Sequence, residues 1–371
     1  MSRYKILVFN WRCWQNPDAG GAEVFTHEVL KRWTAKGHDV TLFTSKFDGS
    51  KKQEVIDNIR VIRQGGWFSV YRHASRFYDA KLAKEKFDVV IDEINTKPFM
   101  VHNFVKNGEK VIALIHQLAR EYWFYETFFP ISYVGYYFLE KRWLRKYTKT
   151  PTVTVSKSTA EDLAALAFEK IFIVGEGLNF KPLKSVPQKA SNPVLVYAGR
   201  LKKAKRPNLA LEAFKIVKKV LPHSEFWIIG EGPFKRKLEK NSCDGVRFFG
   251  SLSNKDRREL IKKAWVLVNP SVREGFGLNV VEANALGVPC VAYNVPGLKD
   301  SVIDGETGFL VKSGDTKALA DALLRVLNDA DLRAELSAKA LEHSKSFSWD
   351  NVADTFLHVV ETVLQEDFAK A

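Results

Sequence analysis

Short apolar runs alternate with amphipathic helical stretches along the first half of the chain. A helix is expected over about Ala22–Lys36, followed by Gly37 where a helix C-cap is common. Because strands that alternate with helices build parallel sheets, this half predicts an α/β architecture. The apolar runs predict strands at Lys5–Asn10, Val40–Thr44, Ile59–Arg63, Val89–Asp92, Val111–His116, Thr152–Ser156 and Ile171–Val174.

The alternation restarts after the polar stretch Lys181–Asn192, which we interpret as a linker because it contains Pro182 and Pro187. The end of the chain, Trp349–Glu366, is expected to form one amphipathic helix with no strand after it. Strands are predicted at Val194–Ala198, Phe226–Ile229, Arg247–Phe249, Trp265–Asn269 and Cys290–Tyr293, and helices at Pro207–Val220, Leu278–Leu286 and Thr316–Asn328.

A chain of 371 residues is too long for one ordinary core and suits two domains. We predict two Rossmann-like, doubly wound domains that face each other across a cleft. The predicted boundaries are 1–185 for an N-terminal domain, 186–348 for a C-terminal domain, and 349–371 for a helix that crosses back to the first domain. Ligands of such sheets bind outside the carboxyl ends of the strands, so motifs that follow strands carry the most weight.

Composition is that of a soluble globular protein, with 46% hydrophobic and 27% charged residues. No apolar run approaches the ~20 residues that span a bilayer, and the run Ile6–Phe9 is too short for a signal-peptide core. We therefore expect a cytoplasmic protein. The three cysteines lie far apart and suggest neither a zinc site nor a disulfide. A net charge of +14 favours polyanionic partners, although an ordinary basic surface explains it equally well.

The first chemical motif runs from Glu274 to Glu282, after the predicted strand that ends at Asn269. Gly275 and Gly277 let the backbone approach a ligand closely, and the helix predicted behind them points free N–H groups outward. Such a helix start can seat a pyrophosphate. The two flanking carboxylates would then suit the hydroxyls of a sugar and of a ribose. A loop acid and a solvated helix residue are the alternative interpretation.

The second motif is the turn from Gly199 to Pro207, directly after the strand Val194–Ala198. Arg200 and Lys205 can converge there on a leaving diphosphate and neutralise its developing charge without a metal. The alternative is a solvated basic turn.

Together, the turn with Arg200 and Lys205 and the pair Glu274 and Glu282 about 70 residues later resemble the retaining glycosyltransferase family 4, which has the GT-B fold. The resemblance covers essentially the whole chain, and it implies that 1–185 is the acceptor-side domain and 186–348 the nucleotide-sugar-binding domain. It implies that Arg200 and Lys205 bind the donor diphosphate, that Glu274 contacts the donor sugar, and that Glu282 contacts the ribose. The other donor-binding positions that it implies are Gly20, Gly21, Gly199, Gly230, Gly232, Gly275, Phe276, Gly277 and Leu278.

His116 ends a predicted strand and therefore points toward the mouth of the cleft. A lone histidine is more often structural, but in the family a histidine at this place lies near the reacting sugar. We assign it to the catalytic set with Arg200, Lys205 and Glu274, in positioning donor sugar and acceptor. The acceptor-side candidates are Glu93, Asn95, Arg120 and Glu121.

Metal catalysis needs carboxylates clustered at a strand end. The sole Asp-x-Asp is Asp329–Asp331, between two late helices, where helix capping explains it better. We expect no metal and no cofactor, with a UDP- or GDP-sugar as the donor substrate.

Residues 122–149 interleave aromatic side chains with lysines and arginines. An amphipathic helix of this composition suits an anionic membrane surface, and a lipid-linked acceptor would follow. A helix packed inside the N-terminal domain is the alternative, and it leaves a soluble sugar acceptor open. No RNA-binding motif supports a nucleic-acid partner.

The sequence thus predicts a metal-independent retaining hexosyltransferase of glycan biosynthesis, cytoplasmic or peripheral on the inner membrane face. A nucleotide-sugar epimerase of the same fold and a non-catalytic sugar-nucleotide- or membrane-binding module remain the alternatives.

Overall fold

The computed structural model describes residues 2–365, which divide into two compact units. The N-terminal unit comprises residues 2–120, 133–177 and 348–365, and the C-terminal unit comprises residues 121–132 and 178–347. The stretch interpreted as a linker packs against the C-terminal unit, because Leu183 and Ala190 contact its hydrophobic core. Lys189 further donates to the carbonyl oxygens of Lys262 and Gly287 at 3.2 and 2.8 Å.

The N-terminal unit is built on one sheet whose described strands follow the order β3-β4-β2-β1-β5-β6-β7-β8. Every pairing is parallel except that of β3 with β4. The strands are β1 (Lys5–Phe9), β2 (Asp39–Thr44), β3 (Gln53–Ile56), β4 (Ile59–Arg63), β5 (Val89–Glu93), β6 (Lys110–Leu114), β7 (Thr152–Thr154) and β8 (Ile171–Ile173). Its main helices are α1 (Gly21–Ala35), α2 (Val70–Ala80), α5 (Glu140–Leu144), α6 (Lys157–Ala164) and α14 (Trp349–Gln365).

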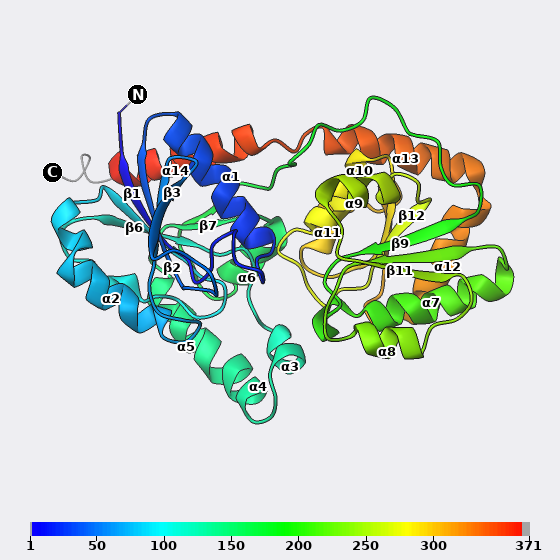
Figure 1. Ribbon diagram of the computed structural model, residues 1–371, viewed down its shortest axis with the longest axis horizontal. Coiled ribbons are helices and arrows are strands. Elements are labelled where there is room, and N and C mark those ends of the chain that lie inside the picture. The colour runs from blue at the N-terminus through cyan, green and yellow to red at the C-terminus, as the bar shows by residue number, and fades with distance from the viewer. Residues whose placement is uncertain (1, 366–371) are drawn as a thin grey trace. The chain divides into compact units, whose positions relative to one another are not determined.

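The C-terminal unit has a second sheet of order β11-β10-β9-β12-β13-β14, parallel throughout its described strands. Helices cover both faces of this sheet (Figure 1). The strands are β9 (Val194–Ala198), β10 (Glu225–Ile229), β11 (Val246–Gly250), β12 (Val266–Asn269), β13 (Cys290–Tyr293) and β14 (Gly308–Val311). The helices are α3 (Tyr122–Glu126), η5 (Lys203–Lys205), α7 (Pro207–Val220), α8 (Lys235–Lys240), α9 (Asn254–Ile261), α10 (Leu278–Ala285), α11 (Leu298–Ser301), α12 (Thr316–Asn328) and α13 (Ala330–Ser344).

In both sheets, successive strands are first added on one side of the first strand and then on its other side, as in doubly wound sheets. The strand order reverses between β1 and β5 in the N-terminal unit and between β9 and β12 in the C-terminal unit. Ligands of such sheets bind where the loops after these two strands diverge. The functional candidates of each unit therefore belong at the carboxyl ends of those strands.

The terminal helix α14 is held in the N-terminal unit by aromatic packing against α1. Trp33 donates its indole N–H to the Ala353 carbonyl at 2.9 Å, and its ring meets Phe356 at 5.0 Å. At Gly177, a Cβ would lie 2.5 Å from the Trp349 ring, so only glycine fits beside the start of this helix. Residue 366, the last of the predicted helix, lies outside the described residues.

Residues 122–149 do not form one continuous amphipathic helix, so that expectation is wrong. The chain forms α3 in the C-terminal unit, then α4 (Ile131–Val134), a π-helical turn at Gly135–Leu139, and α5. Pro130 separates α3 from α4, since a proline disfavours helical backbone at the residue before it.

Candidate functional site

Lys205 and Glu274 meet at the point where the C-terminal sheet reverses. Lys205 ends the short helix η5 after β9, and Glu274 lies in the loop after β12. The Lys205 Nζ is 2.5 Å from Glu274 Oε2, and the two side chains are only 18% and 15% exposed. Ser271 donates to the other carboxylate oxygen at 2.7 Å. The two predicted catalytic residues are thus brought into direct contact, and both oxygens of the carboxylate are engaged.

The environment of Lys205 keeps its ammonium charged. Burial opposes the charge, but the Glu274 carboxylate and Tyr122 together raise the pKa of Lys205 above its ordinary value. Tyr122 belongs to α3 and donates its hydroxyl to the Arg273 carbonyl at 3.1 Å, so residues far away in the sequence help to wall the site. Such a partly enclosed cation can attract an anionic leaving group more strongly than a solvated one.

Arg200 is exposed at the rim of the same turn, where its side chain is accessible to a ligand. Its backbone is fixed, because the Tyr197 hydroxyl donates to the Arg200 carbonyl at 3.0 Å. The next residue, Leu201, donates its N–H to the Glu231 carbonyl at 2.8 Å. The turn therefore presents an exposed guanidinium on a hydrogen-bonded backbone, beside the half-buried ammonium of Lys205.

Gly230 and Gly232 lie in the loop after β10 and pack onto the turn after β9. A Cβ on Gly230 would lie 2.0 Å from the Gly199 carbonyl oxygen, and one on Gly232 would lie 2.5 Å from that of Leu201. Both glycines also have positive φ angles, +140° and +154°. Their close approach to the turn accounts for glycine at these positions, whatever ligand the loop borders.

Helix α10 begins at the same edge with Gly277 as its N-cap. Gly277 has φ +91°, and a Cβ there would lie 2.8 Å from Ser301 Oγ. Asn279 ties the first turn of the helix to the sheet by donating to the Ala198 carbonyl at 3.0 Å and accepting from Asn269 at 3.2 Å. No side chain caps the helix within the described structure, so its first N–H groups can receive an anion.

Glu282 lies one turn further along α10 and pairs with Arg257 of α9. The two side chains are 2.7 Å apart and both are half-buried. Phe276, in the loop between Glu274 and the helix, packs its ring against Phe347 at 5.6 Å. The sequence pattern did not predict a role for either Arg257 or Asn279. Arg257 lies outside the motif, and Asn279 lies inside it but is neither a glycine nor an acid.

In the N-terminal unit, Glu93 and His116 lie against each other at the carboxyl ends of β5 and β6. Glu93 Oε1 is 3.3 Å from His116 Nε2, and both side chains are buried. Thr26 donates to the other oxygen of Glu93 at 2.6 Å, while Phe25 meets the imidazole edge-on at 4.9 Å. Burial raises the pKa of the Glu93 carboxyl. The sequence analysis predicted each residue as a separate site candidate, and the structure places their side chains in contact.

The loop after β1 and the start of α1 complete this edge of the N-terminal sheet. Gly20 donates its N–H to Glu23 Oε2 at 2.6 Å, so that donor is occupied, whereas Gly21 is exposed. Asn95 donates to the side chain of Asn10 at 3.3 Å. Glu93, Asn95, His116 and the glycine loop therefore gather at one edge of the sheet.

Arg120 and Glu121 are neighbours in the sequence but belong to different units. The Arg120 N–H donates to Glu140 at 2.9 Å, and its guanidinium lies 5.5 Å from the Tyr136 ring. Glu121 instead pairs with Arg273 at 3.0 Å, one residue before Glu274. Glu121 thus supports the loop after β12.

Asp92 has a structural environment although it neighbours Glu93. It accepts hydrogen bonds from the Tyr147 hydroxyl at 2.5 Å and from the Phe99 N–H at 3.1 Å. Burial raises the pKa of Asp92 to about 6. These contacts hold the loop after β5 in place, so we assign Asp92 a structural role and no part in ligand binding.

Residues 2–365 contain no group of three or more histidine, cysteine or acidic side chains that could hold a metal ion. Asp329 of the Asp-x-Asp sequence accepts from the Leu332 N–H at 2.9 Å and caps α13. It is therefore a helix cap, as its position between two helices predicted.

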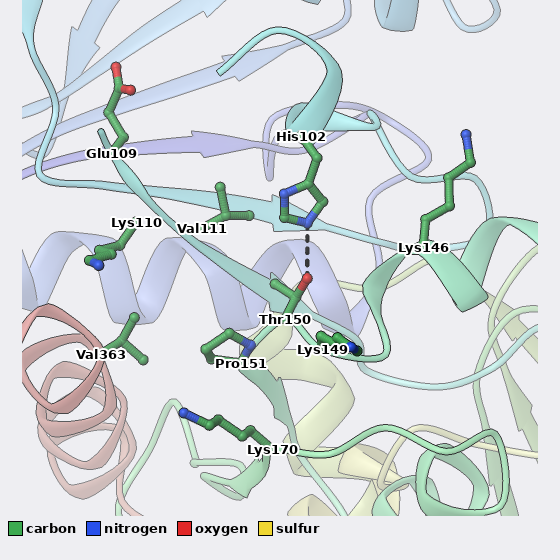
Figure 2. Close-up of a pocket in the computed structure, with 10 residues that line it drawn as sticks. All are labelled: His102, Glu109, Lys110, Val111, Lys146, Lys149, Thr150, Pro151, Lys170 and Val363. Atoms are coloured by element: carbon green, nitrogen blue, oxygen red, sulfur yellow. Dashed lines mark hydrogen bonds between the residues drawn. The ribbon is translucent and has the colours of Figure 1, made fainter. Parts of the chain in front are cut away.

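A cavity of about 500 Å³ opens at the opposite edge of the N-terminal sheet, before β6, β7 and β8 (Figure 2). His102 contacts Thr150 across it at 2.9 Å, and burial lowers the pKa of His102. Four lysines also line it, namely Lys110, Lys146, Lys149 and Lys170. This cavity is separate from the edge that carries Glu93 and His116.

Protein-family models match both halves of the chain. Residues 19–181 match the model described as Glycosyltransferase Family 4, and residues 172–343 match the model described as Glycosyl transferases group 1. The resemblance to glycosyltransferase family 4 seen in the sequence is thus confirmed. The two matches together run through both units, including the turn after β9 and the loop after β12.

Two curated relatives are similar to this chain over about half of its length. It is 31% identical over 224 residues to a D-inositol 3-phosphate glycosyltransferase of Streptomyces scabiei, covering 53% of this chain and 50% of the relative. It is likewise 31% identical over 198 residues to a phosphatidyl-myo-inositol mannosyltransferase of Mycobacterium leprae, covering 51% and 53%. The chain thus spans about half the length of these curated relatives.

The structure of sucrose-phosphate synthase from Thermosynechococcus elongatus superposes with a TM-score of 0.82 at 20% identity, covering 100% of both chains. The GT-B fold predicted from the sequence is therefore confirmed. The epimerase and the non-catalytic module are not favoured, since the matching families and relatives are glycosyltransferases. Among the described residues, no helix is long and apolar enough to cross a membrane.

Proposed function

We propose that this chain is a metal-independent, retaining hexosyltransferase that transfers a sugar from a UDP- or GDP-sugar to an acceptor hydroxyl. The observation that carries the proposal is the enclosed Lys205–Glu274 pair beside the uncapped start of α10. One cation, one carboxylate and a helix end at a single sheet edge match the needs of a sugar diphosphate.

Lys205 and Arg200 act on the leaving group. As the bond from the anomeric carbon to the diphosphate breaks, its electron pair stays on the diphosphate oxygen, and the ammonium and the guanidinium neutralise the added charge. The first N–H groups of α10 stabilise the same anion. Two side-chain cations and a helix end thus take the place that a divalent cation fills in other sugar transfers.

The two acids of the motif hold the hydroxyl groups of the donor. Glu274 engages each oxygen once, through Lys205 and through Ser271, and each oxygen keeps a further lone pair for a sugar hydroxyl. Glu282 is placed for the ribose, with Arg257 neutralising its charge. Retention of configuration rests on family membership, because no side chain of the site is placed as a covalent nucleophile.

The acceptor binds at the carboxyl edge of the N-terminal sheet, where His116 and Glu93 meet. The relatives named for D-inositol 3-phosphate and phosphatidyl-myo-inositol act on hydroxyl-rich acceptors that bear phosphate. They support a polyol or lipid-linked acceptor for this chain. Asn95 and the buried His116–Glu93 pair supply polar groups for such hydroxyls.

The segment from α3 to α5 contacts an anionic membrane surface. Phe128, Phe129 and Phe138 are 71%, 75% and 69% exposed, which is costly unless an apolar medium covers them. Lys146 and Lys149, at the end of the same segment, line the lysine cavity and suit phosphate headgroups (Figure 2). A peripheral position at the inner face of the membrane follows.

The decisive experiment measures nucleotide release from UDP-, GDP- and ADP-sugars, with and without a lipid extract, in the presence and absence of EDTA. We expect release from a UDP- or GDP-sugar that the acceptor extract stimulates and that EDTA leaves unchanged. Loss of activity in EDTA, restored by Mg²⁺, would contradict the metal-independent step. Conversion of the donor sugar without any acceptor would instead indicate an epimerase.

A further inference from the structure

Two adjacent aromatic side chains stand exposed on the loop between β4 and α2, outside the 122–149 segment. Trp67 is 52% exposed and Phe68 is 88% exposed. Scattered single apolar side chains are normal at a surface, but a contiguous aromatic pair marks a binding surface. Neither the transfer step nor the membrane contact proposed above uses these two residues.

The loop holds this pair in a fixed conformation. Gly65 has φ +67°, and a Cβ there would lie 2.9 Å from Ser69 Oγ. The Gly66 N–H donates to the same Ser69 oxygen at 2.9 Å, and the Lys46 N–H donates to the Gly65 carbonyl at 2.8 Å. Hydrogen bonds within the turn and to the chain after β2 thus hold its backbone in place. Because the backbone is already ordered, binding to the aromatic rings costs little conformational entropy there.

Trp11 extends the exposed pair toward the centre of the sheet. Its ring packs edge-on against Trp67, with 4.6 Å between centroids. Ser45, directly after β2, donates both its N–H and its hydroxyl to the Trp11 carbonyl, at 3.3 and 2.5 Å. We call Trp11, Trp67 and Phe68 the aromatic shelf.

The shelf lies at the same sheet edge as the acceptor-side residues. Trp11 follows β1 by two residues, and the Gly65 turn follows β4. The Asn10 side chain accepts from the Arg12 N–H at 3.2 Å and from Asn95 at 3.3 Å. One asparagine therefore joins the backbone beside Trp11 to Asn95, next to Glu93.

Aromatic rings next to polar groups suit a sugar ring. A pyranose presents a face of C–H bonds that packs against an indole or phenyl ring, while its equatorial hydroxyls point sideways to hydrogen-bonding groups. The Arg12 guanidinium, 4.2 Å from the Trp11 ring, and the Asn95 amide provide such groups at the margin of the shelf.

We propose that the aromatic shelf binds a saccharide ring of the acceptor, a proposal that rests on the transferase activity proposed above. The acceptor class is then a glycan or glycolipid with at least one pyranose beside the hydroxyl that is glycosylated. Trp67 and Phe68 act as specificity-determining residues and take no part in the bond-breaking step.

Saturation-transfer NMR on the full chain tests this directly, with methyl α-D-mannopyranoside and methyl α-D-glucopyranoside as probes. Irradiating aromatic protons should transfer saturation to the ring C–H protons of at least one probe in the wild type. Trp67→Ala/Phe68→Ala, and Phe68→Ala alone, should weaken binding, the double variant by roughly tenfold. Phe138→Ala removes an exposed phenylalanine of the same unit and should leave probe binding unchanged.

Two further measurements separate the possible outcomes. Acceptor-free hydrolysis of the donor sugar should be the same in Trp67→Ala/Phe68→Ala as in the wild type, so its loss would indicate damage to the transferase site rather than to the shelf. Sedimentation with phosphatidylglycerol vesicles should be weakened by Phe138→Ala and not by the shelf variant. Absence of saturation transfer to either probe in the wild type, or vesicle binding lost in the shelf variant, overturns the proposal.

Discussion

Both units have a doubly wound sheet, but they carry different chemistry at the edge where ligands bind. The C-terminal edge has an enclosed charge pair, Lys205–Glu274, an exposed arginine and an uncapped helix start. The N-terminal edge has a buried acid–histidine pair, Glu93–His116, and exposed aromatic rings. An anionic, phosphate-bearing ligand suits the first edge and a neutral, hydroxyl-rich one suits the second. The shared fold therefore supplies the position of a site, and the loop residues decide what binds there.

Removing the lysine charge at the C-terminal edge should have the largest effect on turnover. We expect Lys205→Ala to lower kcat by roughly 100- to 1,000-fold, because the leaving diphosphate loses a fixed cation. Both transfer and acceptor-free donor hydrolysis should fall, as measured by nucleotide release. Glu93→Gln, its counterpart at the N-terminal edge, should lower transfer more than hydrolysis.

Lys205→Ala also leaves Glu274 without its partner, which destabilises the fold by itself. Urea unfolding of Lys205→Ala and of Lys205→Ala/Glu274→Gln separates the two effects. The double variant should regain stability without regaining turnover. Turnover near that of the wild type in Lys205→Ala would reject the role of the lysine.

The close packing of loops in the C-terminal unit gives the next largest effect, on stability. Gly230→Ala should destabilise the protein by about 3 kcal/mol, since the new methyl group meets the Gly199 carbonyl and φ is +140°. Gly37→Ala, at φ +94° with open space around it, is the matched control and should cost about 1 kcal/mol. Equal losses in urea unfolding for the two variants would show that contact with the turn after β9 is unimportant.

Asp92 makes the N-terminal unit sensitive to pH. Its folded pKa of about 6 exceeds the ordinary 3.8, so the native state binds more protons than the unfolded state between those values. The stability contributed by Asp92 is present below pH 3.8 and is lost as pH rises through about 6. Relative to wild type, Asp92→Asn should therefore gain about 1.4 kcal/mol between pH 5 and pH 8 in urea unfolding. A difference independent of pH would contradict the raised pKa.

The smallest expected effect concerns the lysine cavity of the N-terminal unit. Lys146→Gln and Lys149→Gln should each weaken binding to phosphatidylglycerol vesicles by about 1 kcal/mol, with no change on phosphatidylcholine vesicles. Lys219→Gln and Lys240→Gln, two single variants in the C-terminal unit, each remove one charge from an exposed position and serve as the controls. An equal loss in the controls would mean that net charge, and not this cavity, governs membrane binding.

Local pattern alone predicted most of the secondary structure. The bounds of β9, β13, α7 and α12 agree with the sequence prediction to the residue, because each is a continuous apolar or amphipathic run with clear ends. The edge strand β3 was not predicted, since it is mostly exposed and pairs antiparallel outside the α/β repeat. The predicted helix over 122–149 is broken, because its first part packs in the other unit.

The sequence by itself therefore determined the repeating α/β pattern, the motif residues Arg200, Lys205, Glu274 and Glu282, and the GT-B fold that follows from them. Only the tertiary structure decided which side chains meet: Lys205 with Glu274 across 69 residues, Glu93 with His116, and Trp11 with Trp67. The physical reason is that apolar periodicity and turn residues act over a few positions, whereas these contacts depend on strand order. Strand order is set by the packing of whole helices and strands, and no short segment records it.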